Sequence, residues 1–179
     1  MKEVTINKQA KLSEHFTLAE MCKTSAKTAD GRSAQGDALL AKNIPSHVHI
    51  ENLKRLCGWL EMLRDEWNRR YGSLTPPKGE GNSDDPIIIN SGYRSEAVNK
   101  AVGGAKGSNH LTGCAADIRV ADIEQALRYA VILLDISDDS REDFDELLLE
   151  RSPRGTYWLH FAVRPSDNRR KVRLIQSLR

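Results

Sequence analysis

The longest regular hydrophobic pattern in the chain runs from residue 46 to residue 72 and predicts an amphipathic helix. Its apolar positions recur three or four residues apart, as one face of a helix requires; they are Ile50, Leu53, Leu56, Cys57, Leu60, Leu63 and Trp67. Ser46 is the expected N-cap and Gly72 the expected stop. A second amphipathic helix is expected after Asp122, with Gln125 at the capping-box position.

Two shorter helices are predicted from their caps. Thr17 with Glu20 forms a capping box after Phe16. Ser95 caps a helix that should run through Ala101. Small and polar residues at 23–42, and the prolines and glycines of 73–85, predict loops.

Alternating or β-branched segments predict strands at residues 86–90, 114–120, 144–150 and 157–163. The last two flank a turn-like insert at 151–156 and should form a hairpin. Strand alternation places Glu146, Leu148 and Glu150 on one face of it, together with Trp158, His160 and Ala162. The expected fold class is therefore α+β: a small antiparallel sheet with helices packed on one face and a zinc site, argued below, on the other.

The bulk properties favour one domain over residues 1–179, with an ordered core at about 16–165 and peripheral segments at 1–14 and 166–179. A net charge of +2 is too small to argue for nucleic acid as a partner. The three cysteines are far apart and odd in number, so no disulfide framework is expected. We expect a monomer.

Targeting signals are weak. Residues 1–14 are polar and lack the apolar core of a signal peptide, and no stretch approaches the roughly 20 apolar residues of a membrane span. We therefore expect synthesis in the cytoplasm, with action on a cell wall only after release by another route, as for a phage or prophage protein.

His110, Asp117 and His160 carry the most informative chemistry. Two imidazoles and one carboxylate make a facial ligand set for a divalent metal, and three protein ligands leave a coordination position open for water. Strand alternation turns Cys114 away from Asp117, so a thiolate ligand is not expected. Taken singly, each residue also has an ordinary structural explanation, such as a hydrogen-bonded core histidine or a solvated aspartate.

The joint pattern of motifs resembles the M15 family of zinc peptidases. It consists of Asn90-Ser91-Gly92-Tyr93-Arg94-Ser95, Val102-Gly103-Gly104-Ala105, Ser108-x-His110, Gly113-x-Ala115-Ala116-Asp117-Ile118 and Trp158-x-His160. That family includes D-alanyl-D-alanine carboxypeptidases and L-alanyl-D-glutamate endopeptidases of peptidoglycan, and the amino-terminal domain of hedgehog proteins is a distant relative. The resemblance implies zinc bound by His110, Asp117 and His160, and Arg94 as a substrate-binding cation.

The catalytic base is less clearly marked. Some M15 members carry an acid three residues before the last histidine, where this chain has Tyr157. Residues 144–150 instead resemble the strand whose terminal glutamate serves as base in the hedgehog-like arrangement. We therefore predict Glu150 as general base, with Glu146 as the reserve on the same face.

Further substrate contacts are predicted around the metal. The planar fork of Arg94 suits a substrate carboxylate or a polarised carbonyl oxygen, although the same residue could simply form a salt bridge at a helix start. Ser108, Trp158 and Tyr93 are also predicted to contact the substrate.

The resemblance therefore implies a zinc metallopeptidase that acts on peptidoglycan stem peptides. The alternative, which the departure at Tyr157 keeps open, is a non-catalytic zinc-containing module that binds cell wall or a protein. A metal-dependent peptidase of general specificity is a third possibility.

Overall fold

The computed structural model describes residue 7 and residues 9–23, 43–72 and 84–176. Over these residues the chain is α+β, as predicted. In chain order the elements are α1 (Leu18–Met21), α3 (His47–Tyr71), β1 (Ile89–Ser91), α4 (Glu96–Ala101), the 3-10 helix η1 (Asn109–Thr112), β2 (Ala115–Arg119), α5 (Ile123–Ser140), β3 (Glu146–Arg151), β4 (Tyr157–Ala162) and β5 (Lys171–Gln176).

The helix starts are where their caps predict them. Thr17 accepts a hydrogen bond from the Glu20 N–H, and the Glu20 carboxylate accepts one from the Thr17 N–H, so the capping box of α1 is complete. Ser46 caps α3 through the His49 N–H. Ser95 and Asp122 cap α4 and α5 in the same way. Each cap satisfies a backbone N–H that has no partner within its own helix.

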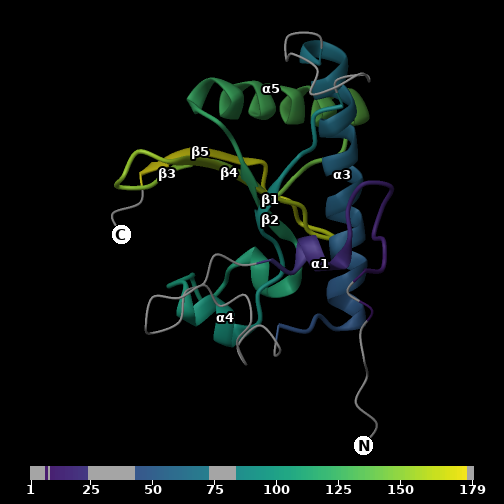
Figure 1. Cartoon of the computed structure of the whole chain (residues 1–179), viewed down its shortest axis with the longest axis vertical. Helices are drawn as coiled ribbons and strands as arrows, with labels where there is room; N and C mark the ends of the chain where they lie inside the picture. The colour runs from purple at the N-terminus through teal and green to yellow at the C-terminus, as the bar shows by residue number, and fades with distance from the viewer. Residues whose placement is uncertain (1–6, 8, 24–42, 73–83, 177–179) are drawn as a thin grey trace, which may run out of the picture.

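The strands form one sheet in the order β1-β2-β4-β3-β5 (Figure 1). The neighbours from β1 to β3 are antiparallel, and the predicted hairpin is the β3–β4 pair. The exception is β5, which runs parallel to β3. This strand lies in the segment expected to be peripheral, so the sheet extends one strand further than the sequence analysis predicted.

Helices cover one face of the sheet. The long helix α3 runs alongside the sheet, and α5 lies over β3 and β4 and also contacts α3 (Figure 1). Leu147 and Leu149 of β3, with Leu159 and Phe161 of β4, point into this core and are buried. The Trp59 ring of α3 packs against Phe161, with ring centroids 5.5 Å apart. The opposite face of the sheet carries polar side chains, among them Asp117 and His160.

Other local predictions were only partly right. Strand β1 begins at Ile89 rather than Pro86. Proline has no N–H to donate to a ladder, which is consistent with the later start. His110 lies in the short 3-10 helix η1, an element that the sequence analysis did not predict. The predicted loop at 23–42 lies outside the described residues apart from Lys23, as does 73–85 apart from residues 84 and 85.

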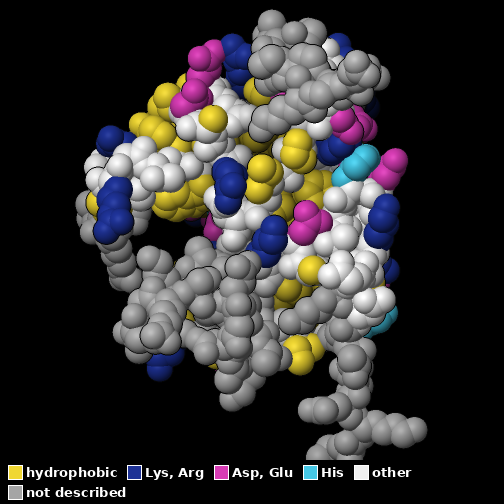
Figure 2. Space-filling model, viewed as in Figure 1, with side chains coloured by type: hydrophobic (Ala, Val, Ile, Leu, Met, Phe, Trp, Pro, Cys, Tyr) yellow, Lys and Arg dark blue, Asp and Glu magenta, His cyan; other side chains and the backbone are white. Residues whose placement is uncertain are grey.

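The surface carries both signs of charge. On the face shown in Figure 2, Lys and Arg side chains are interspersed with Asp and Glu. This mixing agrees with the small net charge of the sequence. None of the helices among the described residues has the length and apolar character that crossing a membrane would need.

Candidate metal centre and active-site cleft

His110 is fixed by the short helix η1. Ser108 caps η1 by accepting from the His110 N–H, and Gly113 ends it at a φ of 72°, a left-handed conformation that glycine adopts without strain. The ring is buried, and its Nδ1 lies 2.7 Å from the Gly92 carbonyl oxygen. Because a carbonyl can only accept, Nδ1 carries the proton. The lone pair of Nε2 then faces Asp117.

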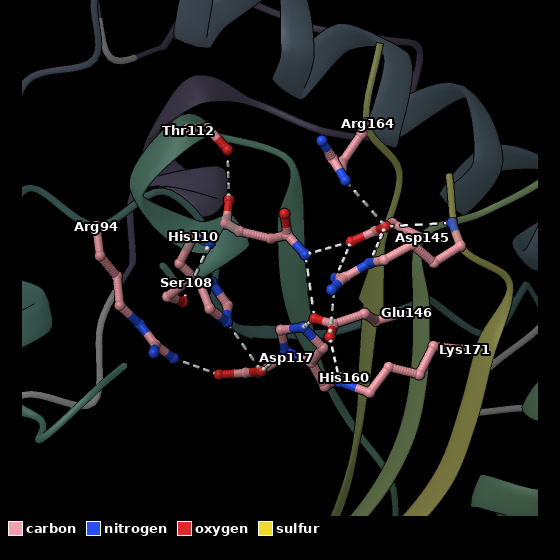
Figure 3. A network of polar contacts seen from close by, with 12 residues as sticks. Arg94, Ser108, His110, Thr112, Asp117, Asp145, Glu146, His160, Arg164 and Lys171 are labelled. Atoms are coloured by element: carbon pink, nitrogen blue, oxygen red, sulfur yellow. Dashed lines mark hydrogen bonds and ion pairs between the residues drawn. The ribbon is translucent and has the colours of Figure 1, made fainter. Parts of the chain in front are cut away.

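Asp117 and His160 lie directly opposite each other on β2 and β4. Asp117 Oδ1 is 2.9 Å from His160 Nδ1 and 3.2 Å from His110 Nε2. One ligand atom from each of the three residues lies within 4.8 Å of the other two (Figure 3). The structure therefore brings together the three residues that the sequence analysis selected as ligands. Cys114 is buried instead, with its Sγ 3.8 Å from the Thr112 carbonyl oxygen.

These residues fit a divalent metal. Each histidine turns one nitrogen to the shared centre and has its other nitrogen beside an outer partner, Gly92 for His110 and Glu146 for His160. Such outer partners fix the tautomer and orientation of metal-binding histidines. Two nitrogens and one oxygen are a donor set that suits zinc and leaves a position open.

The protonation states of the group are tightly linked. Burial alone would raise the pKa of Asp117, but its close contacts with the two imidazoles of His110 and His160 outweigh burial and hold that pKa well below its usual range. Burial lowers the pKa of His110. Burial would also lower the pKa of His160, but hydrogen bonds to Asp117 and Glu146 raise it to about 9. Metal binding at His160 Nδ1 must therefore displace a proton at neutral pH.

Glu150 occupies the position expected of a base. It pairs with Trp158 across the hairpin and so lies diagonal to His160. Glu150 lines the same cavity as the three candidate ligands and has no hydrogen bond to another described side chain. Burial raises its pKa, which makes the carboxylate a better proton acceptor.

Glu146 is engaged elsewhere. Its Oε2 lies 3.6 Å from His160 Nε2 and accepts a hydrogen bond from Asn109, while its Oε1 accepts one from Lys171 of β5 at 2.8 Å (Figure 3). The bond to His160, reinforced by Lys171, holds the pKa of Glu146 far below its usual range despite burial. A carboxylate held in this way is a partner of His160 rather than a free proton acceptor.

Arg94 lies at the cavity wall but is already paired. Its guanidinium contacts the Asp117 carboxylate through Nη2 and donates to Ser91 Oγ at 2.8 Å through Nε. Its backbone N–H donates to the His110 carbonyl oxygen. Among the described residues, Nη1 has no hydrogen-bond partner. Arg94 therefore orients a candidate metal ligand and has one amino group available towards the cavity.

The other predicted contact residues divide into two groups. Ser108 and Trp158 line the cavity, although the hydroxyl of Ser108 also caps η1. Tyr93 does not: it is buried in the hydrophobic core with its ring 4.8 Å from that of His49. Its placement gives no support to substrate binding. Tyr157, at the position of the missing acid, lies on the face of β4 opposite His160 and packs with Arg151.

The cavity has a volume of about 1240 Å³. Typical small-ligand sites are about 300–1,000 Å³, so this one has room for a peptide. The sequence analysis did not assign a role to two residues that line it, Asn109 and Arg119, nor to two groups that hold side chains of the site, Lys171 and the Gly92 carbonyl. Asn109 and Gly92 lie inside the motifs that were recognised, but Lys171 reaches the site only through the long-range pairing of β5.

Comparison with known proteins agrees with this geometry. The family model described as Peptidase M15 matches residues 78–135, which include Arg94, His110 and Asp117. No curated protein matches the chain. Over these residues the chain is therefore similar to the Peptidase M15 family, and two of the three members of the His-Asp-His group lie in the matched segment.

Proposed function

We propose that this protein is a zinc metallopeptidase that hydrolyses amide bonds in peptidoglycan stem peptides. The observation that carries the proposal is the position of His110, Asp117 and His160, whose ligand atoms lie within 4.8 Å of one another on the wall of a peptide-sized cavity beside Glu150. The substrate class comes from the family resemblance and not from the geometry.

The three candidate ligands would hold the zinc ion, which, when bound, acidifies a water molecule and polarises the scissile carbonyl. Glu150 accepts a proton from the attacking water as its oxygen bonds to the carbonyl carbon. Arg94 donates to the oxygen on which negative charge develops. Glu150 then returns its proton to the leaving amine as the carbon–nitrogen bond breaks, so the carboxylate is regenerated.

The role of Glu150 is supported by its environment. Its pKa is raised by burial. It lies on β3 opposite Trp158 of β4, two residues from His160, which in turn pairs with Asp117. Glu146, by contrast, is held by Lys171 and Asn109 against His160. One face of β3 therefore offers one carboxylate for proton transfer and another for orienting a ligand.

Digestion of purified peptidoglycan tests this function. Protein stripped of metal, and the same protein reloaded with zinc, should be compared on several peptidoglycan chemotypes, with the released products identified by mass spectrometry. We expect cleaved stem peptides only from the zinc-loaded sample, and the products would identify the bond that is cut.

The absence of an acid at Tyr157 keeps a second function in view, a zinc-containing module that binds cell wall or a protein without turnover. That function predicts no released product from any chemotype with zinc confirmed in place. It also predicts that zinc-loaded protein sediments with insoluble peptidoglycan.

A further inference from the structure

A second row of side chains crosses the site face of the sheet beside the candidate ligands. Asp117 pairs with His160, and two residues further along β2, Arg119 pairs with Trp158. Trp158 in turn pairs with Glu150 of β3. Arg119, Trp158 and Glu150 therefore form a line across three strands, adjacent to the line that holds the metal ligands, and all three line the cavity.

Arg119 differs from Arg94 in its charge environment. Arg94 is paired with Asp117, whereas Arg119 is exposed, and among the described residues its guanidinium donates one hydrogen bond, from Nε to the neutral Asn90 Oδ1 at 3.1 Å. Within the described part of the chain it has no carboxylate partner. Lys23, another cation of the cavity wall, also lacks one there. Asn90 holds one edge of the Arg119 guanidinium, and neither of its two amino groups has a hydrogen-bond partner among the residues that the structure describes.

The remaining charges of the cavity do not neutralise Arg119. The Asp117 carboxylate is committed to His110, His160 and Arg94, and Glu146 to His160 and Lys171. Glu150 lies two strands away from Arg119 in the same row, about 10 Å by normal strand spacing. Arg119 is thus a cation next to the candidate metal ligands and is available to bind an anionic group.

We propose that Arg119 binds a carboxylate of the substrate within about two residues of the amide that is cut. This inference rests on the proposed peptidase function and narrows it to acidic peptides. Arg119 follows Asp117 by two residues on a strand, about 6.6 Å, and an extended peptide covers the same distance in two residues. A guanidinium holds a carboxylate through two parallel hydrogen bonds, and Trp158 provides an apolar floor for the substrate atoms between.

The carboxylate could belong to the chain terminus or to an acidic side chain, and synthetic peptides separate these sources. A stem pentapeptide with all carboxylates free is compared with analogues in which one carboxylate at a time is a carboxamide. For the wild type, one carboxamide should lower kcat/KM about 10- to 100-fold, the range of a hydrogen-bonded charge pair. The position of that carboxamide identifies the source.

On the peptide with all carboxylates free, Arg119→Met should have a kcat/KM about 10- to 100-fold below that of the wild type. On the carboxamide analogue that the wild type cleaves poorly, the variant should show no further decrease in kcat/KM. Arg119→Lys should recover part of the loss, because it restores the charge without the fork. Arg154→Met is the matched control: it removes the same charge from the β3–β4 turn, outside the cavity wall, and should behave as wild type. Equal kcat/KM for the wild type on all peptides, or a uniform loss for Arg119→Met, would overturn the assignment.

Failure of the peptidase function can be told apart from failure of this site. If zinc-loaded wild type cleaves none of the peptides, titration calorimetry on the same series still tests Arg119. Weaker binding of one carboxamide in the wild type, with no such difference in Arg119→Met, supports the carboxylate site alone. Equal affinities, or no binding of any peptide, overturn it.

Discussion

At the residue scale, each histidine of the site has its second ring nitrogen beside a fixed partner. His110 donates to the Gly92 carbonyl, and His160 faces the Glu146 carboxylate. Strand alternation was enough to predict that Asp117 and His160 would share a face, because side-chain direction along a strand is a local property. The contact between Glu146 and His160 was not predicted, since the lysine that holds Glu146 comes from a strand absent from the sequence analysis.

This contact leads to a prediction about metal affinity. Glu146→Gln keeps the shape of the side chain but removes the charge beside His160, so we expect zinc to bind at least about tenfold more weakly. Competition with a chromogenic chelator measures the dissociation constant. Unchanged affinity together with loss of turnover would mean that Glu146, and not Glu150, is the base.

The cysteine beside the site provides a second test. Cys114 is buried and its Sγ lies near the Thr112 carbonyl oxygen rather than among the ligands. We expect Cys114→Ser to retain about one zinc per chain, whereas His160→Ala should lose it. Metal content measured by atomic emission on both variants checks the ligand set, and equal losses would refute it.

At the element scale, the helix caps and the β3–β4 hairpin were predictable and the edges of the sheet were not. Caps and strand alternation depend on residues within a few positions of one another. Strand β5 pairs in parallel with β3 across 25 residues, and nothing local in its alternating charged and apolar positions specifies that partner. The burial of Tyr93 was not predicted for a related reason: its ring packs against His49 of α3, which is remote in sequence.

The start of β3 gives a prediction about acid stability. Asp145 is fully buried and accepts hydrogen bonds from Arg169 and Asn109. Burial would raise its pKa, but the bonds to Arg169 and Asn109 outweigh this and lower it. The ionised Asp145 carboxylate therefore makes its full contribution to stability at pH values above its pKa in the unfolded chain, about 3.9. That contribution is lost as the pH falls through the lower pKa of Asp145 in the folded protein.

Asp145→Asn should accordingly reduce the free energy of unfolding by about 1–3 kcal/mol at pH 7, because it weakens the charge-assisted hydrogen bonds that the buried carboxylate accepts from the half-exposed Arg169. The difference from wild type should shrink below pH 4. Urea titrations of metal-free protein at several pH values measure this without interference from metal release. Asp139→Asn, at an exposed position on α5, is the control and should match wild type at every pH. A constant difference across pH would contradict the account.

At the scale of the whole molecule, the site depends on a core that holds the sheet against α3 and α5. Leu60 of α3 is fully buried in this core, whereas Leu127 of α5 is 52% exposed. We expect Leu60→Ala to lower the free energy of unfolding by about 2–5 kcal/mol and Leu127→Ala to change it by less than about 0.5 kcal/mol. Urea unfolding of the two variants tests this, and equal costs would contradict the packing described.

The central claim is that one face of this sheet combines a metal-binding group with a separate carboxylate base. Turnover of zinc-loaded Glu150→Gln measures it most directly, on whichever stem peptide the wild type cleaves. The account predicts wild-type zinc content with a kcat about 10²- to 10⁴-fold lower, the usual contribution of a general base. A fully loaded Glu150→Gln protein that cleaves at the wild-type rate would contradict it.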